Sequence, residues 1–171
     1  MKPLKSWNNE DFEAEYGNVD YKDKVVMDIG AEIGTTAYFF LTKGAKEVIA
    51  VEGYEPYFRE LIRNINGDSR VKPINLWITS EKDFEKLIEE YNPDIVKVDI
   101  EGAEISLIKV NPKVLSRPSI WIIETHSLET KDAITNKFLN VGYKLTREFR
   151  FAGSIYILTF EKRWSKLCLE S

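Results

Sequence analysis

Apolar runs of strand length alternate along the chain with longer segments in which apolar residues recur at helical spacing. The short runs predict seven strands, over residues 25–29, 48–52, 71–78, 95–100, 119–125, 143–151 and 154–160. The longer segments predict helices over 34–42, 56–65 and 80–91, from about 103, and over 128–141. This alternation is typical of an α/β fold, in which helices cover a mostly parallel sheet.

Two breaks in the pattern indicate where particular strands lie. Pro73 interrupts the third strand, and because proline cannot donate to a strand ladder, we expect that strand at an edge of the sheet. A tight turn at Ala152-Gly153 separates the last two strands, which are therefore expected to pair antiparallel.

The first twenty residues predict a short helical cover on one domain that spans residues 1–171. Asn8 is the expected N-cap, Trp7 and Phe12 are placed to form a hydrophobic staple, and Gly17 is expected to end the helix. A length of 171 residues fits one domain and leaves little room for a second.

Composition narrows the class of protein. The formal net charge is −4, whereas proteins that bind nucleic acid usually carry a basic excess, so a nucleic-acid partner is not expected. The lone cysteine, Cys168, excludes an internal disulfide and any CxxC pair, which suits a reducing compartment. No apolar run reaches the roughly 20 residues needed to cross a bilayer, and the N-terminal residues do not resemble a secretory signal. We therefore expect a cytoplasmic protein with no membrane partner.

A glycine-containing loop joins the first strand to the next helix. Glycine at positions 30 and 34 lets a ligand approach the backbone closely, and the helix N-terminus offers N–H groups to an anion. The middle glycine of a dinucleotide fingerprint is absent, because Ala31 and Glu32 stand there. Glu32 would repel a pyrophosphate, whereas the zwitterionic, sulfonium-bearing S-adenosylmethionine tolerates carboxylates such as Asp28 and Glu32. The spacing therefore favours S-adenosylmethionine over NAD.

Glu52 ends the second strand, where an acidic side chain can accept hydrogen bonds from both ribose hydroxyls of an adenosine ligand. The alternative is that Glu52 caps the helix that begins at Pro56, or that it is simply solvated. Combined with Asp28 and the glycine loop, it predicts a nucleoside site.

A second acidic cluster, Asp99, Glu101 and Glu104, follows the fourth strand. Ligands of parallel sheets bind beyond the carboxyl ends of the strands, so Asp28, Glu52, Asp99 and Glu101 are expected to converge on one crevice. Gathering carboxylates raises the energy of the folded state unless cations or hydrogen bonds offset it, which suggests function.

These residues resemble the FkbM-type family of class I S-adenosylmethionine-dependent methyltransferases. The similarity spans about residues 25–126, and its most specific part is the block Lys97-Val98-Asp99-Ile100-Glu101-Gly102-Ala103-Glu104. The other matching segments are Asp28-Ile29-Gly30-Ala31-Glu32-Ile33-Gly34, Glu52 and Glu124-Thr125-His126. The chain departs from the family at Gly53, where proline is common, and near Trp77, where a small residue is usual. We interpret Trp77 as a core residue in preference to one that stacks on adenine.

The resemblance implies a Rossmann-like, seven-stranded sheet of order 3-2-1-4-5-7-6, with only strand 7 antiparallel and helices on both faces. It implies S-adenosylmethionine as cofactor and methylation of a hydroxyl on a small molecule or sugar. The predicted cofactor residues are Asp28, Gly30, Ala31, Glu32, Gly34, Glu52 and Gly53. The predicted catalytic residues are Asp99, Glu101, Glu124 and His126.

His126 is the only histidine, and an ordinary pKa near 6.5 would suit a general base at neutral pH. Otherwise it is a loop histidine bonded to backbone. Glu124 could orient the imidazole, bind the acceptor, or pair with a lysine. Asp99 and Glu101, with Glu124 or Glu104, could hold a divalent metal, but we predict no metal site. Glu104 at a helix start is interpreted as complementing the helix dipole.

Three further functions stay open. An RNA or protein methyltransferase and a non-catalytic module that binds S-adenosylmethionine are the alternatives, and an NAD oxidoreductase is disfavoured. The sequence has no insertion to recognise an acceptor. We therefore expect a second copy of the chain or a partner protein to complete the acceptor pocket.

Overall fold

The computed structural model, which describes Met1 and residues 11–163, has the predicted seven-stranded sheet of order β3-β2-β1-β4-β5-β7-β6. Neighbouring strands are parallel except at β7, which runs antiparallel to both β5 and β6. The α/β prediction, the edge position of the third strand and the terminal hairpin are confirmed. The strands are β1 (Val25–Ile29), β2 (Glu47–Glu52), β3 (Val71–Asn75), β4 (Ile95–Val98), β5 (Ile120–Thr125), β6 (Tyr143–Ala152) and β7 (Ile155–Lys162).

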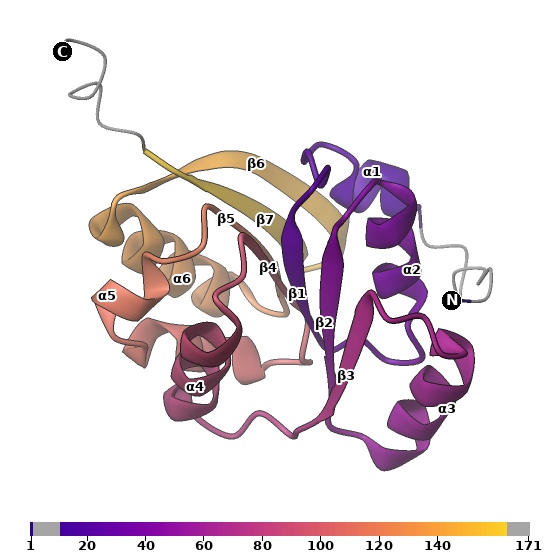
Figure 1. Cartoon of the computed structure of the whole chain (residues 1–171). Helices are drawn as coiled ribbons and strands as arrows, with labels where there is room; N and C mark the ends of the chain where they lie inside the picture. The colour runs from indigo at the N-terminus through magenta and orange to yellow at the C-terminus, as the bar shows by residue number, and fades with distance from the viewer. Residues whose placement is uncertain (2–10, 164–171) are drawn as a thin grey trace, which may run out of the picture.

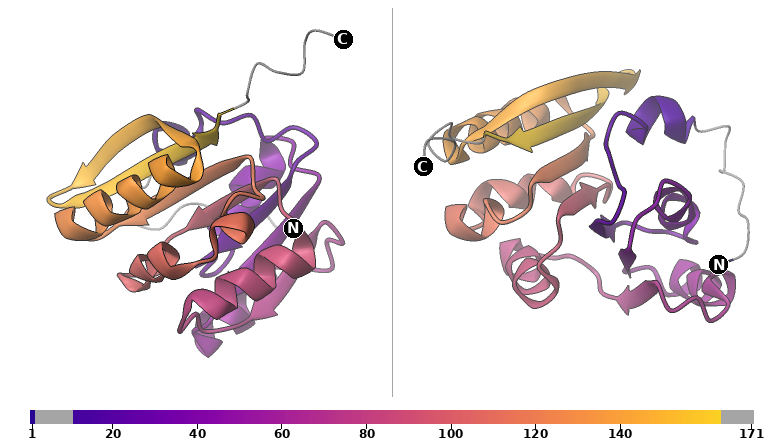
Figure 2. Two further views of the ribbon diagram at one scale, coloured as in Figure 1. Left: turned by 90° about the vertical axis from the view of Figure 1, so that its left-hand side faces the viewer. Right: turned by 45° about the horizontal axis from the view of Figure 1, so that its top comes forward.

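Helices cover both faces of the sheet (Figure 1; Figure 2). On one face lie α1 (Phe12–Tyr16), α2 (Thr35–Thr42) and α3 (Glu55–Ile65), which bury their apolar sides against β1 and β2. On the other face lie α4 (Glu81–Tyr91), the 3₁₀ helix η2 (Ala103–Lys109), α5 (Pro112–Leu115) and α6 (Leu128–Val141). Each face has its own buried apolar cluster, so the sheet is the shared wall of two cores.

The central strands end at one level, which brings the loops that follow them together. In the register of the sheet Ile29 lies opposite Val51 on one side and Val98 on the other. The polar residues after each of these positions therefore meet at the carboxyl edge of the sheet, as expected for a parallel sheet.

Two predicted strands end earlier in the structure than the sequence indicated. The third was expected to reach residue 78 but ends at Asn75, because its partner β2 ends at Glu52. The fourth was expected to reach residue 100 but ends at Val98, because β1 turns away at Gly30. In both places one more backbone bond continues past the strand, from Leu76 N to Glu52 O and from Asp99 N to Ile29 O.

The first helix begins later than predicted. Asp11 is the N-cap of α1, and its side chain accepts a hydrogen bond from Ala14 N at 3.0 Å. The expected cap Asn8 and the staple residue Trp7 lie outside the described residues, as does Cys168. Gly17 ends the helix as predicted.

Arg147 of β6 fastens α1 to the sheet. Its guanidinium donates to the carbonyl oxygens of Ala14 and Glu15 and to Asn18 Oδ1. The terminal hairpin therefore contributes a charged side chain to the attachment of α1, beside the packing of Phe12 and Tyr16 against α2.

One short helix was missed by the sequence analysis. α5 begins after Asn111, whose side chain accepts from Lys113 N at 2.9 Å, and Pro112 occupies its first turn. Four residues are too few to produce a helical period. Over the described part of the chain, no helix has both the length and the apolar character that a bilayer crossing would need.

Candidate functional site

The loop after β1 requires glycine at position 30. Gly30 has a φ of +82°, and a Cβ placed there would lie 1.8 Å from the carbonyl oxygen of Asp99. The N–H groups of Gly30 and Ala31 both donate to Val51 O, at 2.9 and 3.0 Å. The loop is therefore packed between the ends of β2 and β4, and Gly34, with a φ of +95°, is the N-cap of α2.

A buried ion pair supports this loop from inside the sheet. Asp28 is fully buried, accepts a hydrogen bond from Thr36 Oγ1 at 2.6 Å, and lies 3.3 Å from Lys97 Nζ. Lys97 Nζ also donates to Gly30 O at 3.0 Å and lies 3.7 Å from Asp99. Burial raises the pKa of Asp28, although Lys97 and Thr36 oppose the increase. Burial would lower the pKa of Lys97, but the Asp28 and Asp99 carboxylates outweigh it and raise that pKa.

Lys97 belongs to the site, although the sequence analysis gave it no role. The signal was available, since Lys97 is the one charged residue inside the apolar strand Ile95–Val98. In the register of the sheet it stands directly opposite Asp28.

A cavity of about 480 Å³ opens at the end of β2. It is lined by four of the predicted cofactor residues and by exposed aromatic side chains, including Gly30, Glu32, Glu52, Gly53, Tyr57 and Trp77. The predicted cofactor residues Asp28, Ala31 and Gly34 line neither this cavity nor its smaller neighbour. These three residues belong to β1 and the loop after it, but they do not reach the wall of either cavity.

Glu52 is buried at the wall of this larger cavity. Its Oε2 accepts from Glu32 N at 2.8 Å and its Oε1 from Tyr54 N at 2.6 Å. Each carboxylate oxygen can accept a second hydrogen bond, so two bonds to a ligand are compatible with those already made.

Trp77 is not a core residue, contrary to the prediction. Its side chain is 65 % exposed and lines the larger cavity, because β3 has already ended and the chain runs along the rim. Gly53 lies close beneath it, where a Cβ would come within 2.7 Å of Trp77 Cα. Glycine in place of the family's usual proline thus lets the two segments touch.

A smaller cavity of about 190 Å³ adjoins the first. The two share Gly30, Glu32, Asp99 and Glu101 in their linings. The smaller one adds side chains from α1, β5 and the terminal hairpin, among them Glu15, Tyr16, Lys97, Glu124, His126 and Phe151. All four predicted catalytic residues therefore lie together in its wall.

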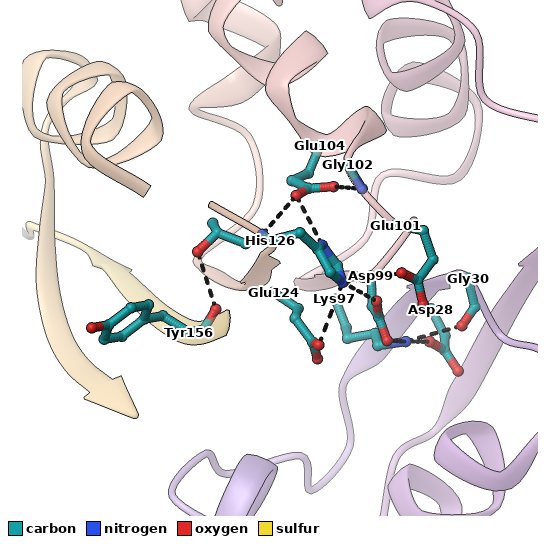
Figure 3. A network of polar contacts seen from close by, with 11 residues as sticks. Asp28, Gly30, Lys97, Asp99, Glu101, Gly102, Glu104, Glu124, His126 and Tyr156 are labelled. Carbon is teal, nitrogen blue, oxygen red and sulfur yellow. Dashed lines mark hydrogen bonds and ion pairs between the residues drawn. The ribbon is translucent and has the colours of Figure 1, made fainter. Parts of the chain in front are cut away.

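Glu104 ties the loops after β4 and β5 together (Figure 3). Its side chain is fully buried, and Oε1 lies 3.0 Å from His126 Nδ1 and accepts from His126 N at 3.1 Å. Oε2 accepts from Gly102 N at 2.7 Å. Glu104 does lie in the first turn of η2, as interpreted from the sequence, but its buried carboxylate also contacts His126, which that interpretation did not include.

The other ring nitrogen of His126 faces three carboxylates. Nε2 lies 3.5 Å from Glu101, 3.6 Å from Glu124 and 3.9 Å from Asp99. The hydrogen bond to Glu104 and the surrounding acids raise the pKa of His126 to about 9, against the opposing effect of burial. This pKa lies above the ordinary value near 6.5 used in the sequence analysis, so the arrangement favours the protonated ring at neutral pH.

Glu124 has the pKa that the histidine was expected to have. Burial, and then the nearby Asp99 carboxylate, raise the pKa of Glu124 to about 7, although Lys97 and His126 oppose the increase. Near neutral pH this carboxyl group exists in both protonation states, which is the property of a general base matched to its working pH.

Asp99, Glu101 and His126 each offer one donor atom within 4.8 Å of the others, a spacing that a divalent cation could bridge. The same atoms lie at ion-pair distances, with His126 Nε2 3.5 Å from Glu101 and 3.9 Å from Asp99.

Comparison with known proteins finds a methyltransferase family model that matches part of the chain. Residues 78–145 match the family model described as Methyltransferase FkbM domain, which confirms over that stretch the resemblance predicted from the sequence. A curated relative, uncharacterized protein 158B of Sulfolobus islandicus rod-shaped virus 1, is 35 % identical over 98 residues. That alignment covers 57 % of this chain and 59 % of the relative.

Solved structures with this fold include methyltransferases. The ribosomal protein L11 methylase of Lactobacillus delbrueckii subsp. bulgaricus has a TM-score of 0.63 and 20 % identity, over 86 % of this chain and 74 % of that one. The precorrin-6y C5,15-methyltransferase of Geobacter metallireducens has a TM-score of 0.62 and 17 % identity, over 83 % and 81 %. The Rossmann-like methyltransferase fold is confirmed.

Proposed function

We propose that this chain transfers a methyl group from S-adenosylmethionine to a hydroxyl group of a small molecule or sugar. The premise is the FkbM methyltransferase match on a class I fold, which together support an S-adenosylmethionine-dependent methyltransferase. The observation that carries the proposal is the pair of adjoining cavities with Gly30, Glu32, Asp99 and Glu101 as their common wall. One has the size and lining for a nucleoside, and the other has the titratable groups.

The residues of the larger cavity fit S-adenosylmethionine. Glu52 is placed to accept from the ribose hydroxyls, and Trp77 and Tyr57 offer apolar faces to the adenine. Gly30 has no Cβ between the loop and Asp99, and the shared acidic wall suits a sulfonium cation. When bound, the cofactor supplies an electrophilic methyl group.

The residues of the smaller cavity would prepare the acceptor. Glu124 takes the proton of the acceptor hydroxyl, because its raised pKa lets it both hold and release a proton near neutral pH. His126 carries its own positive charge beside Glu124 and so favours the carboxylate form before the proton arrives. Asp99 and Glu101 complete the wall at the boundary of the two cavities.

A neutral acceptor fits the smaller cavity better than RNA does. Glu15, Asp99, Glu101 and Glu124 line it, and they would repel the phosphates of a nucleic acid. The open side of the cavity, where Phe151 is 45 % exposed, is where a second copy or a partner protein would complete the pocket. The single cysteine in the sequence is the basis for proposing a cytoplasmic location.

Calorimetric titration with S-adenosylmethionine, S-adenosylhomocysteine and NAD tests the proposal. We expect the first two to bind and NAD not to bind. Glu52→Gln keeps one acceptor oxygen for the backbone and is expected to weaken binding by about 1–3 kcal/mol. Glu55→Gln, an exposed change on α3, is the matched control and should bind as the wild type does. Binding of NAD alone would reject the proposal, and binding without methyl transfer to any hydroxyl compound would leave only a binding module.

A further inference from the structure

We propose that Glu104 is a positioning residue that holds His126 with its Nε2–H directed into the acceptor cavity, so that Glu124 and not His126 receives the proton of the acceptor. The catalytic meaning of this inference rests on the proposed function. The geometry of Glu104 and His126 does not, and it can be tested in the protein without cofactor or acceptor.

The backbone before η2 is shaped to turn Glu104 inward. Glu101 and Gly102 both have positive φ, +52° and +102°, so the chain makes a left-handed reversal directly after the acidic loop. For Glu101, a residue with a Cβ, this conformation is unfavourable by about 1–3 kcal/mol and must be supported by its surroundings. The hydrogen bond from Gly102 N to Glu104 Oε2 provides part of that support.

The Glu104 carboxylate requires a proton on His126 Nδ1. Its carboxylate is fully buried and already accepts from His126 N and Gly102 N. A buried carboxylate with two N–H donors is ionised, since hydrogen bonds to the charged form favour it. Burial would raise its pKa, but the hydrogen bond with the His126 ring, followed by backbone hydrogen bonds and the charge of His126, outweighs burial and lowers that pKa. It can only accept, so Nδ1 must donate, and Nε2 is the nitrogen left to face the cavity.

The groups that face Nε2 favour a proton there as well. Asp99 and Glu101 follow β4, Glu124 lies on β5, and each has an oxygen within 3.9 Å of Nε2. From the remaining sides of the cavity come Lys97 on β4, Glu15 and Tyr16 on α1, and Glu32 in the first loop. Lys97 lies against Asp28, Asp99 and Gly30 O, so its charge is compensated deeper in the site.

A doubly protonated imidazole cannot take another proton, which assigns proton transfer to Glu124. His126 Nε2–H is instead placed to donate a hydrogen bond to the reacting oxygen, and it lies at an ion-pair distance of 3.6 Å from the Glu124 carboxylate. Charge-assisted hydrogen bonds of this kind are roughly twice as strong as neutral ones. Removal of the Glu104 carboxylate should therefore change the protonation of His126, although Glu104 lies in η2 and His126 follows β5.

Nuclear magnetic resonance can follow this directly, because the chain has a single histidine and its imidazole signals need no assignment. In the wild type both ring nitrogens should be protonated at pH 7, with titration near pH 9. Loss of a hydrogen bond to a charged group should make Glu104→Gln titrate about one to two pH units lower. Glu129→Gln, an exposed carboxylate three residues after His126, is the control and should leave the titration unchanged.

Several results would overturn the inference. They are an unchanged histidine titration in folded Glu104→Gln, a neutral ring at pH 7 in the wild type, and a shift of the Nε2 signal on adding Mg²⁺. Should Glu104→Gln fail to fold, the protonation of the wild-type ring at pH 7 decides. Failure of the proposed function would be seen separately, as absence of S-adenosylmethionine binding with the histidine titration as expected.

Discussion

Replacement of Gly30 by alanine tests two requirements at the cofactor loop. One is the close approach of the Asp99 carbonyl, and the other is a φ that residues other than glycine rarely adopt. A non-glycine residue at a left-handed φ is less stable by about 1–2 kcal/mol. At Gly30 the new Cβ would in addition lie 1.8 Å from Asp99 O, whereas ordinary contacts begin at 3.4 Å. The end of β4 must therefore move away from the end of β1.

The expected loss of stability follows from the hydrogen bond that this movement breaks. The hydrogen bond from Asp99 N to Ile29 O, now 3.0 Å, would be lost, at about 0.5–1.5 kcal/mol. Added to the backbone strain, this predicts that Gly30→Ala lowers the free energy of unfolding by about 1.5–3.5 kcal/mol. Because Asp99 belongs to the shared wall of the two cavities, affinity for S-adenosylhomocysteine should also fall by at least about tenfold, or about 1.4 kcal/mol.

Gly67 offers a matched control. Its φ of +77° is close to that of Gly30, but no described atom lies within 4 Å of a Cβ built there. Backbone strain alone should therefore lower the free energy of unfolding of Gly67→Ala, by about 1–2 kcal/mol, and its affinity for the nucleoside should be unchanged. Urea unfolding and calorimetry measure both quantities. Equal losses of stability in the two variants, or unchanged binding in Gly30→Ala, would refute the account of the loop.

Three further predictions concern the groups around the loop. Lys97→Met should destabilise the protein by about 3–5 kcal/mol in urea unfolding, because it leaves Asp28 buried and charged, and Asp28→Asn in the same chain should restore most of the loss. A double variant no more stable than Lys97→Met would contradict the ion pair. Glu124→Gln should reduce kcat by about 10²–10⁴-fold. In the wild type the base must lose its proton, so activity should rise with pH through about 7, and this dependence should be absent in Glu124→Gln. Arg147→Ala should speed amide hydrogen exchange in α1 by about tenfold or more, since it removes charged hydrogen bonds to two carbonyl groups, while exchange elsewhere is kept. Arg63→Ala, on the exposed side of α3, is the control.

The sequence predicted the order of elements and the meeting of the strand ends because these depend on local pattern and on a general property of parallel sheets. The glycine at position 30, the acid at the end of β2 and the acidic block after β4 all lie where the pattern indicated.

The errors concern the directions of side chains, which depend on distant residues. Asp28 was expected at the ligand, but in the sheet it stands opposite Lys97 and turns into the core. Trp77 was expected in the core, but the strand that would have buried it ends at Asn75. Glu104 is recognisable as a helix-start acid, whereas its contact with His126 crosses 22 positions of sequence. The spacing of residues along the sequence does not indicate such a contact.

A crystal structure of the chain with S-adenosylhomocysteine would test the central claim most directly. The account predicts ribose hydroxyls within hydrogen-bond distance of Glu52, adenine beside Trp77, and the sulfur at the wall that the two cavities share, near Asp99. A nucleoside bound elsewhere on the molecule, or a larger cavity that takes up no nucleoside at a millimolar concentration of the ligand, would contradict it.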